Sequence, residues 1–143
     1  MKIKKYVAIF MVLGLVMMVN MTTFGVELLK TVPYRINQDQ NNNFTSGDVS
    51  IAKGKKPTMS SNTATVYTAG EAYGLLHKKE LFGAFYSEVD YEIQTYSRPG
   101  QTRNFVLSKV PSSTDYRFTL MARDRSLNPT GLDMLINNVT VTY

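Results

Sequence analysis

The sequence has no cysteine, no tryptophan and a single histidine among its 143 residues. Without cysteine the chain can form no disulfide framework, no thiolate metal site, no lipoprotein anchor and no cysteine nucleophile, and one histidine cannot supply a two-histidine metal site. No catalytic or cofactor motif stands out in what remains. We therefore predict a protein without catalytic residues, cofactor or metal ligands, and one that acts by binding.

The first 25 residues differ from the rest of the chain. Lys2, Lys4 and Lys5 precede an apolar run from Tyr6 to Val19, and the run then gives way to polar and small residues up to Gly25. A secretory signal peptide typically has a positively charged N-terminal region, a short apolar stretch and small residues before the cleavage site. We predict a signal helix over residues 1–25 with cleavage after Gly25, and a single secreted domain over residues 26–143.

An uncleaved membrane anchor is the alternative interpretation, because no charged residue lies between Lys5 and Glu27. A membrane span needs about 17 to 25 predominantly apolar residues, and the strongly apolar stretch is shorter than that. Cleavage is therefore favoured, and it would leave an extracellular domain without stable membrane insertion.

The absence of cysteine in an exported chain, with its lysine, asparagine, tyrosine and methionine usage, indicates a Gram-positive bacterium.

The positive charge of the chain belongs largely to this leader. The net charge is +5, and removing residues 1–25 leaves 13 basic and 11 acidic residues. So small an excess gives little support for nucleic-acid binding, and we predict no nucleic-acid partner. One basic cluster, Lys53, Lys55 and Lys56, lies in a segment with glycine and proline. It is interpreted as a solvated loop, with weak contact to anionic wall polymer or membrane lipid as the alternative.

The mature sequence favours β structure, because apolar and polar residues alternate in several short runs bounded by turn residues. Gly70 to Gly83 is the exception, and we expect one short helical turn or an irregular connection there, since Gly74 interrupts any helix. Seven or so strands separated by turns predict an all-β, antiparallel two-sheet sandwich. The expected strands are Val32–Asn37, Val49–Ala52, Ala64–Thr68, Phe85–Tyr96, Arg103–Val110, Tyr116–Arg123 and Asn138–Tyr143.

Two of these strands carry the clearest alternation. In the strand over 116–123 the predicted inward residues are Tyr116, Phe118, Leu120 and Ala122. In the strand over 85–96 the apolar residues are expected to face inward and the polar ones outward, because half-buried antiparallel strands alternate in this way. The inward set is then Phe85, Val89, Tyr91 and Ile93, and the outward set is Tyr86, Glu88, Asp90, Glu92, Gln94 and Tyr96.

The segment from Asp115 to Asp124, followed by Val139 to Val141, resembles the last two strands of Cys-free bacterial immunoglobulin-like and fibronectin-like domains. The resemblance places Tyr116 where those domains have a tyrosine corner, with the ring under the sheet and the hydroxyl bonded to backbone. It implies an immunoglobulin-like sandwich. The layout of leader, asparagine-rich stretch and aromatic-rich β domain is also similar to small secreted proteins of Gram-positive bacteria, some related to sandwich-fold bacteriocins.

The outward polar residues define a predicted binding face, with Arg117 and Arg123 on a neighbouring strand. One interpretation is a salt-bridged exposed sheet, in which cross-strand pairs contribute about 0.2 to 1 kcal/mol each. The other is a polar surface with tyrosines at its ends that stacks on sugar rings or on a partner protein. The residues of this predicted face are Tyr86, Glu88, Asp90, Glu92, Tyr96, Arg117 and Arg123.

Two further groups have a structural and a functional interpretation. Asp124, Asn128 and Asp133 are oxygen-bearing residues of one loop, which suits either Ca²⁺ or ordinary turn formation, and turn formation is favoured. His77 has no adjacent ligand partner and is expected to be an exposed loop imidazole.

The function that follows is a secreted, non-enzymatic interaction or adhesion module that binds a cell-wall glycan or a protein. A bacteriocin-like antagonist, or its protective partner, is the alternative. A hydrolase with dispersed carboxylates is disfavoured, since glycoside hydrolysis needs two carboxyl groups about 5 to 9 Å apart across a cleft.

Overall fold

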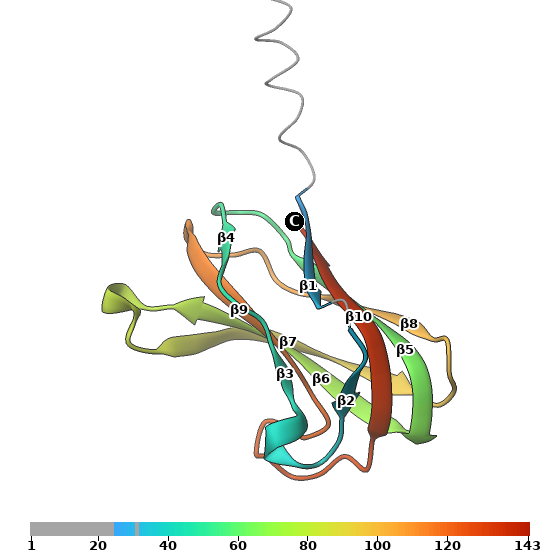
Figure 1. Ribbon diagram of the computed structural model, residues 1–143. Helices are drawn as coiled ribbons and strands as arrows, with labels where there is room; N and C mark the ends of the chain where they lie inside the picture. Colours follow the sequence, from blue (N-terminus) through green and yellow to red (C-terminus); the bar gives the residue numbers. More distant parts are fainter. Residues whose placement is uncertain (1–24, 31) are drawn as a thin grey trace, which may run out of the picture.

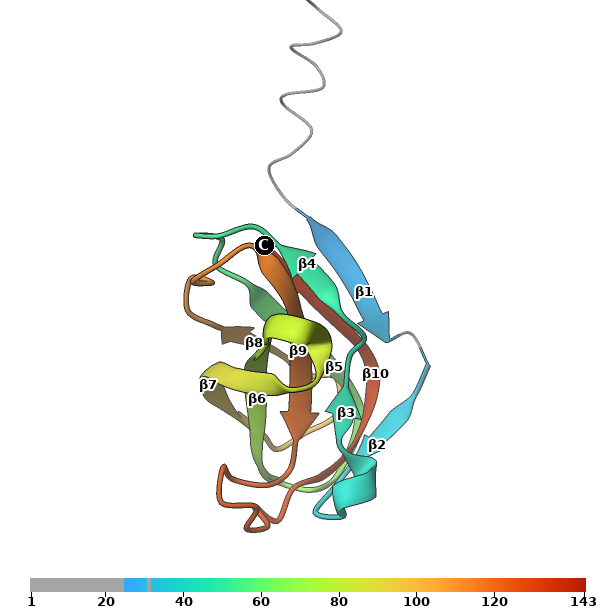
Figure 2. The same cartoon turned by 90° about the vertical axis from the view of Figure 1, so that its left-hand side faces the viewer.

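The computed structural model describes residues 25–30 and 32–143, and they form two antiparallel sheets packed face to face (Figures 1 and 2). Sheet A contains β1 (Val26–Lys30), β2 (Tyr34–Ile36), β5 (Thr58–Thr68), β8 (Thr102–Val106) and β10 (Asp133–Thr142). Sheet B contains β3 (Phe44–Thr45), β4 (Val49–Ile51), β6 (Gly70–Lys79), β7 (Tyr86–Tyr96) and β9 (Thr114–Met121). Two single 3-10 turns, η1 (Gln40–Asn42) and η2 (Leu81–Gly83), complete the described elements.

The strand order is that of a jelly roll rather than of an immunoglobulin domain. Sheet A runs β1-β10-β5-β8 with β2 further along β10, and sheet B runs β3-β9-β6-β7 with β4 further along β9. If β1 with β2, and β3 with β4, are each taken as one interrupted strand, successive strands alternate between the sheets except at the β6–β7 hairpin. The predicted all-β sandwich is confirmed, whereas the immunoglobulin-like order is corrected, because that fold pairs its first two strands within one sheet.

The predicted leader over 1–25 lies outside the described residues except for Gly25. That residue exchanges backbone hydrogen bonds with Tyr143 of 3.1 Å in both directions, just before β1. Within the described residues, no helix has the length and hydropathy needed to cross a membrane.

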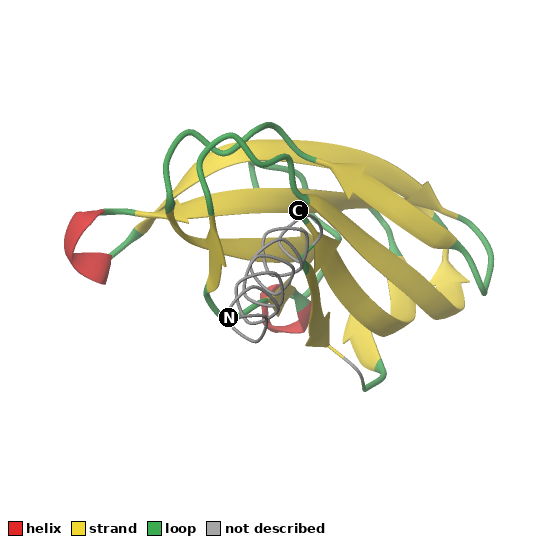
Figure 3. Cartoon of the chain, turned by 90° about the horizontal axis from the view of Figure 1, so that it is seen from above, coloured by secondary structure: helices red, strands yellow, loops and turns green. Residues whose placement is uncertain are grey.

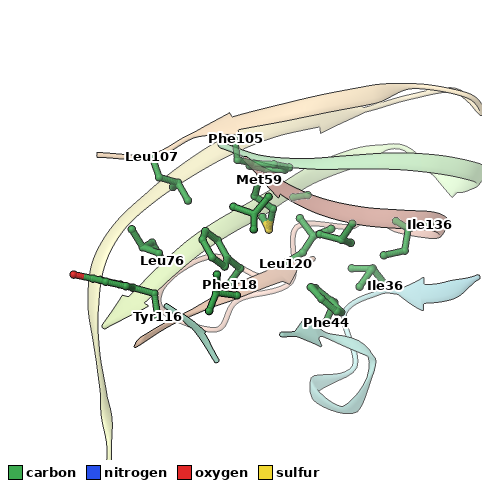
Figure 4. Packing of buried hydrophobic residues seen from close by; sticks show 14 of the residues in the cluster. Ile36, Phe44, Met59, Leu76, Phe105, Leu107, Tyr116, Phe118, Leu120 and Ile136 are labelled. Carbon is green, nitrogen blue, oxygen red and sulfur yellow. The ribbon is translucent and has the colours of Figure 1, made fainter. Parts of the chain in front are cut away.

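The core lies between the sheets and is built from the inward side of almost every strand (Figure 4). The inward set predicted from sequence is confirmed, since Tyr116, Phe118 and Leu120 of β9 and Ala122 just after it are all fully buried. The residues expected to face outward are not all exposed to water, because Thr119 and Met121 are also buried. From sheet A, Met59, Phe105 and Ile136 are among the side chains that meet them. Burial of such side chains contributes about 1.5 to 3 kcal/mol each, so this core is the main source of stability.

Tyr116 forms the predicted corner. Its ring is fully buried, and its hydroxyl donates a 2.7 Å hydrogen bond to the backbone oxygen of Ser112, four residues earlier. The bond fixes the turn that leads into β9 while the ring packs in the core. This corner therefore occurs here on a jelly-roll strand order.

Most of the segment over 70–83 is a strand, and the expected short helical turn is found only at its end, in η2. Residues 70–79 form β6, which pairs with β7 on one side and β9 on the other. Gly74, which argued against a helix, points into the core, where a Cβ would lie 2.4 Å from a ring carbon of Phe105. Glycine is needed there because the opposite sheet packs directly against the backbone.

Candidate functional site

The outer face of sheet B is the surface on which aromatic and charged side chains gather, and we call it the tyrosine face. Its members come from three adjacent strands and one loop, so residues distant in sequence meet on it. Cross-strand pairing brings Tyr73 opposite Ile93, Leu75 opposite Tyr91, and His77 opposite both Glu88 and Arg117. The tyrosine face consists of Tyr73, Leu75, His77, Tyr86, Glu88, Tyr91, Ile93, Arg117 and, from the β9–β10 loop, Arg125.

A β-bulge in β7 decides which of the predicted residues belong to this face. Leu76 pairs with Asp90 but His77 pairs with Glu88, so Val89 is an extra residue and the alternation of β7 changes phase there. Such a bulge moves every following side chain to the opposite face. Tyr86 and Glu88 lie outward as predicted, and beyond the bulge the outward positions pass to odd-numbered residues.

The prediction was therefore wrong for Asp90 and Glu92, which point from the inward side of β7 toward the edge of sheet A. The backbone N–H of Ser108 donates to Asp90 Oδ2 at 2.7 Å, and the N–H of Val106 donates to the Glu92 carboxylate. Gln94 continues the series by donating to the backbone oxygen of Asn104 at 3.1 Å. These side chains form hydrogen bonds with the backbone groups along the free edge of β8. Without them, the edge would present unpaired N–H and C=O groups to another chain.

Tyr96, the other predicted end of the binding face, is a core residue. It is fully buried, and its hydroxyl lies 3.4 Å from the backbone oxygen of Ser61 in sheet A. Burial raises the pKa of the Tyr96 phenol above its ordinary value. Conversely, three of the four residues expected inside are outside, since Phe85, Tyr91 and Ile93 are 60%, 37% and 39% exposed, and only Val89 packs against the core.

The centre of the tyrosine face is a stack of two tyrosine rings and a guanidinium group. The rings of Tyr73 and Tyr91 are 6.0 Å apart between centroids and inclined by 13°. Arg125 lies over Tyr91 at 4.6 Å from the ring centroid and forms a 2.7 Å ion pair with Glu88. Burial raises the pKa of the Tyr73 phenol, so the hydroxyl stays protonated and remains a donor.

A second polar cluster ties Tyr86 and Arg117 together at the end of the face nearest the hairpin tip. Asp48 accepts 2.7 Å hydrogen bonds from Lys79, from the Tyr86 hydroxyl and from Arg117. The guanidinium of Arg117 also lies 4.0 Å from the centroid of the Tyr86 ring. The Lys79 ammonium, followed by the Tyr86 hydroxyl, lowers the pKa of the Asp48 carboxyl. Tyr86 is thus held rigidly, with one face already covered.

His77 lies between these two clusters in β6, not in an exposed loop as expected. Its ring is partly buried, and the loss of hydration lowers the pKa of the imidazole despite the nearby Glu88 carboxylate. A neutral imidazole offers both a hydrogen-bond donor and an acceptor. Because the chain has one histidine, this side chain is also a unique reporter for the face.

The remaining predicted residues serve the loop between β9 and β10. Arg123 does not join the face, since its guanidinium donates to the backbone oxygens of Gln38 and Leu127. Asp124 accepts from the backbone N–H of Ser126 and of Asn128 at 2.8 and 2.9 Å, as in ordinary turns.

Of the three oxygen-bearing residues considered for Ca²⁺, the side chains of Asp124 and Asn128 are hydrogen-bonded to each other at 3.0 Å, whereas the Asp133 carboxylate pairs with Arg35 at 2.6 Å. Within residues 25–30 and 32–143, no three histidine or carboxylate side chains converge on a common point suited to a metal ion.

Sequence reasoning missed Tyr73, Tyr91, Asp48 and Arg125. The apolar character of Tyr91 placed it inside, and the assignment of residues 70–83 to a turn concealed Tyr73. Asp48 and Arg125 lie in connections whose spatial neighbours no local pattern reveals.

Comparison with known proteins gives little further information. No family model matches the chain, and no curated protein matches its sequence. Among solved structures, the CBM22-1 and GH10 modules of Clostridium thermocellum endo-1,4-beta-D-xylanase 10B, complexed with xylohexaose, match at TM-score 0.38 and 11% identity, over 83% of this chain and 26% of that one. A family two carbohydrate esterase from Cellvibrio japonicus matches at TM-score 0.25 and 10% identity, over 84% and 33% of the two chains.

The chain thus spans about a quarter to a third of the length of these two structures. At such TM-scores the similarity defines neither a ligand nor an activity for this protein.

Proposed function

We propose that this protein is an exported β-sandwich module that binds a cell-wall glycan through the tyrosine face. The observation that carries the proposal is the Tyr73–Tyr91 pair, two nearly parallel rings held on an outer sheet face. The C–H faces of a pyranose ring are apolar and pack on aromatic rings, whereas sugar hydroxyls need polar partners. A surface that offers both groups side by side suits a saccharide.

The polar partners lie within the same face. Glu88 and Arg125 form an exposed ion pair beside Tyr91, and His77 supplies an uncharged imidazole next to it. The side chains of Arg125 and Glu88 are 52% and 29% exposed, so both can exchange their mutual contact for hydroxyl groups of a ligand. Exposed Ile93 extends the apolar strip. Rigid aromatic groups with a few convergent polar groups are the usual composition of a small-ligand site.

Binding is favoured over catalysis because the exposed carboxylate of Glu88 has no second free carboxylate beside it among the described residues. Asp90 and Glu92 accept backbone N–H groups at the edge of β8, and Asp48 accepts three hydrogen bonds. Glycoside hydrolysis needs one carboxyl group free as an acid and another as a base or nucleophile. These contacts support a non-enzymatic role, and export rests on the leader predicted over 1–25.

The test is titration calorimetry with soluble peptidoglycan fragments. Tyr73→Ala and Tyr91→Ala should each weaken binding on the order of tenfold, as expected for the loss of one aromatic contact. Tyr67→Ala is the matched control, since Tyr67 is 57% exposed under Arg35 but lies on sheet A. It should bind like the wild type.

A second readout locates the ligand. The ring proton resonances of His77 report on the centre of the tyrosine face, and they should move on titration with the fragments. Binding that leaves these resonances unchanged, or that Tyr67→Ala weakens as much as Tyr91→Ala, would show that the ligand binds elsewhere.

A further inference from the structure

A separate surface at one end of the sandwich combines exposed apolar side chains with lysines, and we call it the basic end. It is formed by the β6–β7 hairpin tip over 80–85, the loop over 52–57 and the turn over 108–113 (Figure 1). Backbone bonds join the last two segments, from Gly54 N to Val110 O and from Val110 N to Lys55 O, both 2.9 Å. A groove of about 520 Å³, lined by residues 78–81 and 112–114, connects them to the hairpin.

The hairpin tip holds two large apolar side chains in water. Leu81 is 82% exposed and Phe85 is 60% exposed. Figure 3 shows η2, which contains Leu81, projecting beyond both sheets at the far left. The tip is nevertheless ordered, since Glu80 N donates to Phe85 O at 3.1 Å and Gly83 N donates to Glu80 O at 3.0 Å. An ordered tip that keeps apolar groups in solvent is typical of an interaction site.

The charges around this tip are predominantly positive. Lys53, Lys56 and Lys109 are exposed and Lys55 is partly exposed. Among the described residues, none of these four lysines forms a salt bridge, whereas the local carboxylates are already paired: Glu80 with Lys78, and Asp48 and Asp115 with Lys79. The basic end therefore carries uncompensated positive charge beside its apolar tip.

We propose that the basic end docks on an anionic phospholipid bilayer, with Leu81 and Phe85 entering the interfacial region and the lysines facing the headgroups. Lysines attract an anionic leaflet, and apolar side chains beside them gain from leaving water. A polyanionic wall polymer would pair with the lysine charges, but it would not bury the two apolar side chains away from water. In Figure 1 β1 begins at the top, beside the loop over 52–57 that carries three of the lysines, whereas the hairpin tip projects at the left.

This surface differs from the tyrosine face, so the two proposals can fail independently. Tyr73 and Tyr91 lie farther along β6 and β7, opposite Ile93 and Leu75, and not among the residues of the hairpin tip. Docking through the tip would leave them free to bind a glycan.

The absence of cysteine allows a test in the full chain. Phe85→Cys, labelled with an environment-sensitive fluorophore, should shift its emission to the blue on adding vesicles of phosphatidylglycerol and phosphatidylcholine in equal parts. Tyr67→Cys is the matched control because it is equally exposed on sheet A and should not respond. The label reports its own surroundings, so the comparison holds even if residues 1–24 also bind lipid.

The charge contribution is tested in the same labelled chain with Lys53, Lys55 and Lys56 replaced by Gln. The apparent affinity for these vesicles should fall on the order of a hundredfold, because each lysine near an anionic leaflet contributes roughly a factor of five. Pure phosphatidylcholine vesicles should give no shift. An equal shift with neutral vesicles, a shift at residue 67, or a response at residue 85 to soluble teichoic acid but not to vesicles would overturn the proposal.

Discussion

Phe105 in sheet A packs on the backbone of Gly74 in sheet B, so closely that a Cβ on Gly74 would lie 2.4 Å from one ring carbon and 2.6 Å from another. Phe105 is fully buried between the sheets and cannot move aside without opening the core. Because of this contact, the two sheets can pack together only if residue 74, in the middle of β6, is a glycine.

Replacing Gly74 should therefore destabilise the fold. Gly74→Ala forces the added methyl against Phe105, and overpacking of this kind costs about 1 to 3 kcal/mol. Urea unfolding of the two proteins measures the difference. Gly47→Ala is the control, since no heavy atom lies within 4 Å of its Cβ, and it should be close to neutral. Equal stability of Gly74→Ala and wild type would mean that the sheets lie farther apart at this point.

The corner formed by Tyr116 predicts a graded loss of stability. Tyr116→Phe removes only the bond to Ser112 and should cost about 1 kcal/mol, whereas Tyr116→Ala also removes a buried ring and should cost about 3 to 5 kcal/mol. The second loss is a large part of the 5 to 15 kcal/mol that typically stabilises a domain. Thermal melts of both variants test this order, and a melting temperature of Tyr116→Phe as low as that of Tyr116→Ala would contradict it.

Asp90 and Glu92 should protect the edge of β8 rather than bind a ligand. In Glu92→Ala the amide of Val106 loses its acceptor, and its hydrogen exchange should accelerate about tenfold, which corresponds to about 1.4 kcal/mol. Asp90→Ala should do the same at Ser108. The exposed edge should also promote association at high protein concentration. Glu71→Gln, an exposed residue on β6, should leave exchange at both amides unchanged, and acceleration in this control would argue against a local cause.

The Asp48 cluster should make stability depend on pH in the acid range. Its carboxyl has a pKa lowered in the folded protein from the ordinary value of 3.8, chiefly by the hydrogen bond from Lys79. The stabilisation is therefore complete above about pH 4 and is lost as the pH falls toward the lower folded pKa. Asp48→Asn should flatten the decline of melting temperature below pH 4. Asp39→Asn, in the loop before η1, is the control and should decline like the wild type.

Local pattern predicted the class of the fold because alternation with a period of two is a property of neighbouring residues. It located β9 and the end of β10, and it identified the buried faces of both. The alternation showed only that Tyr116 faces inward, whereas its corner role was implied by the resemblance to immunoglobulin-like and fibronectin-like domains. The local pattern could not predict the strand order, since β1 pairs with β10 across more than a hundred residues of sequence.

The sequence by itself determined that this chain has no cysteine chemistry, that its strands are amphipathic and that Tyr116 faces the core. Only the tertiary structure decided the site. One extra residue at Val89 reverses the alternation of β7, and the inward side of this edge strand meets the polar edge of β8 over most of its length. The carboxylates of Asp90 and Glu92 therefore point inward, toward backbone N–H groups at the edge of β8, while Tyr91 and Ile93 point outward. These directions depend on partners from another strand, so the neighbouring residues in the sequence do not reveal them.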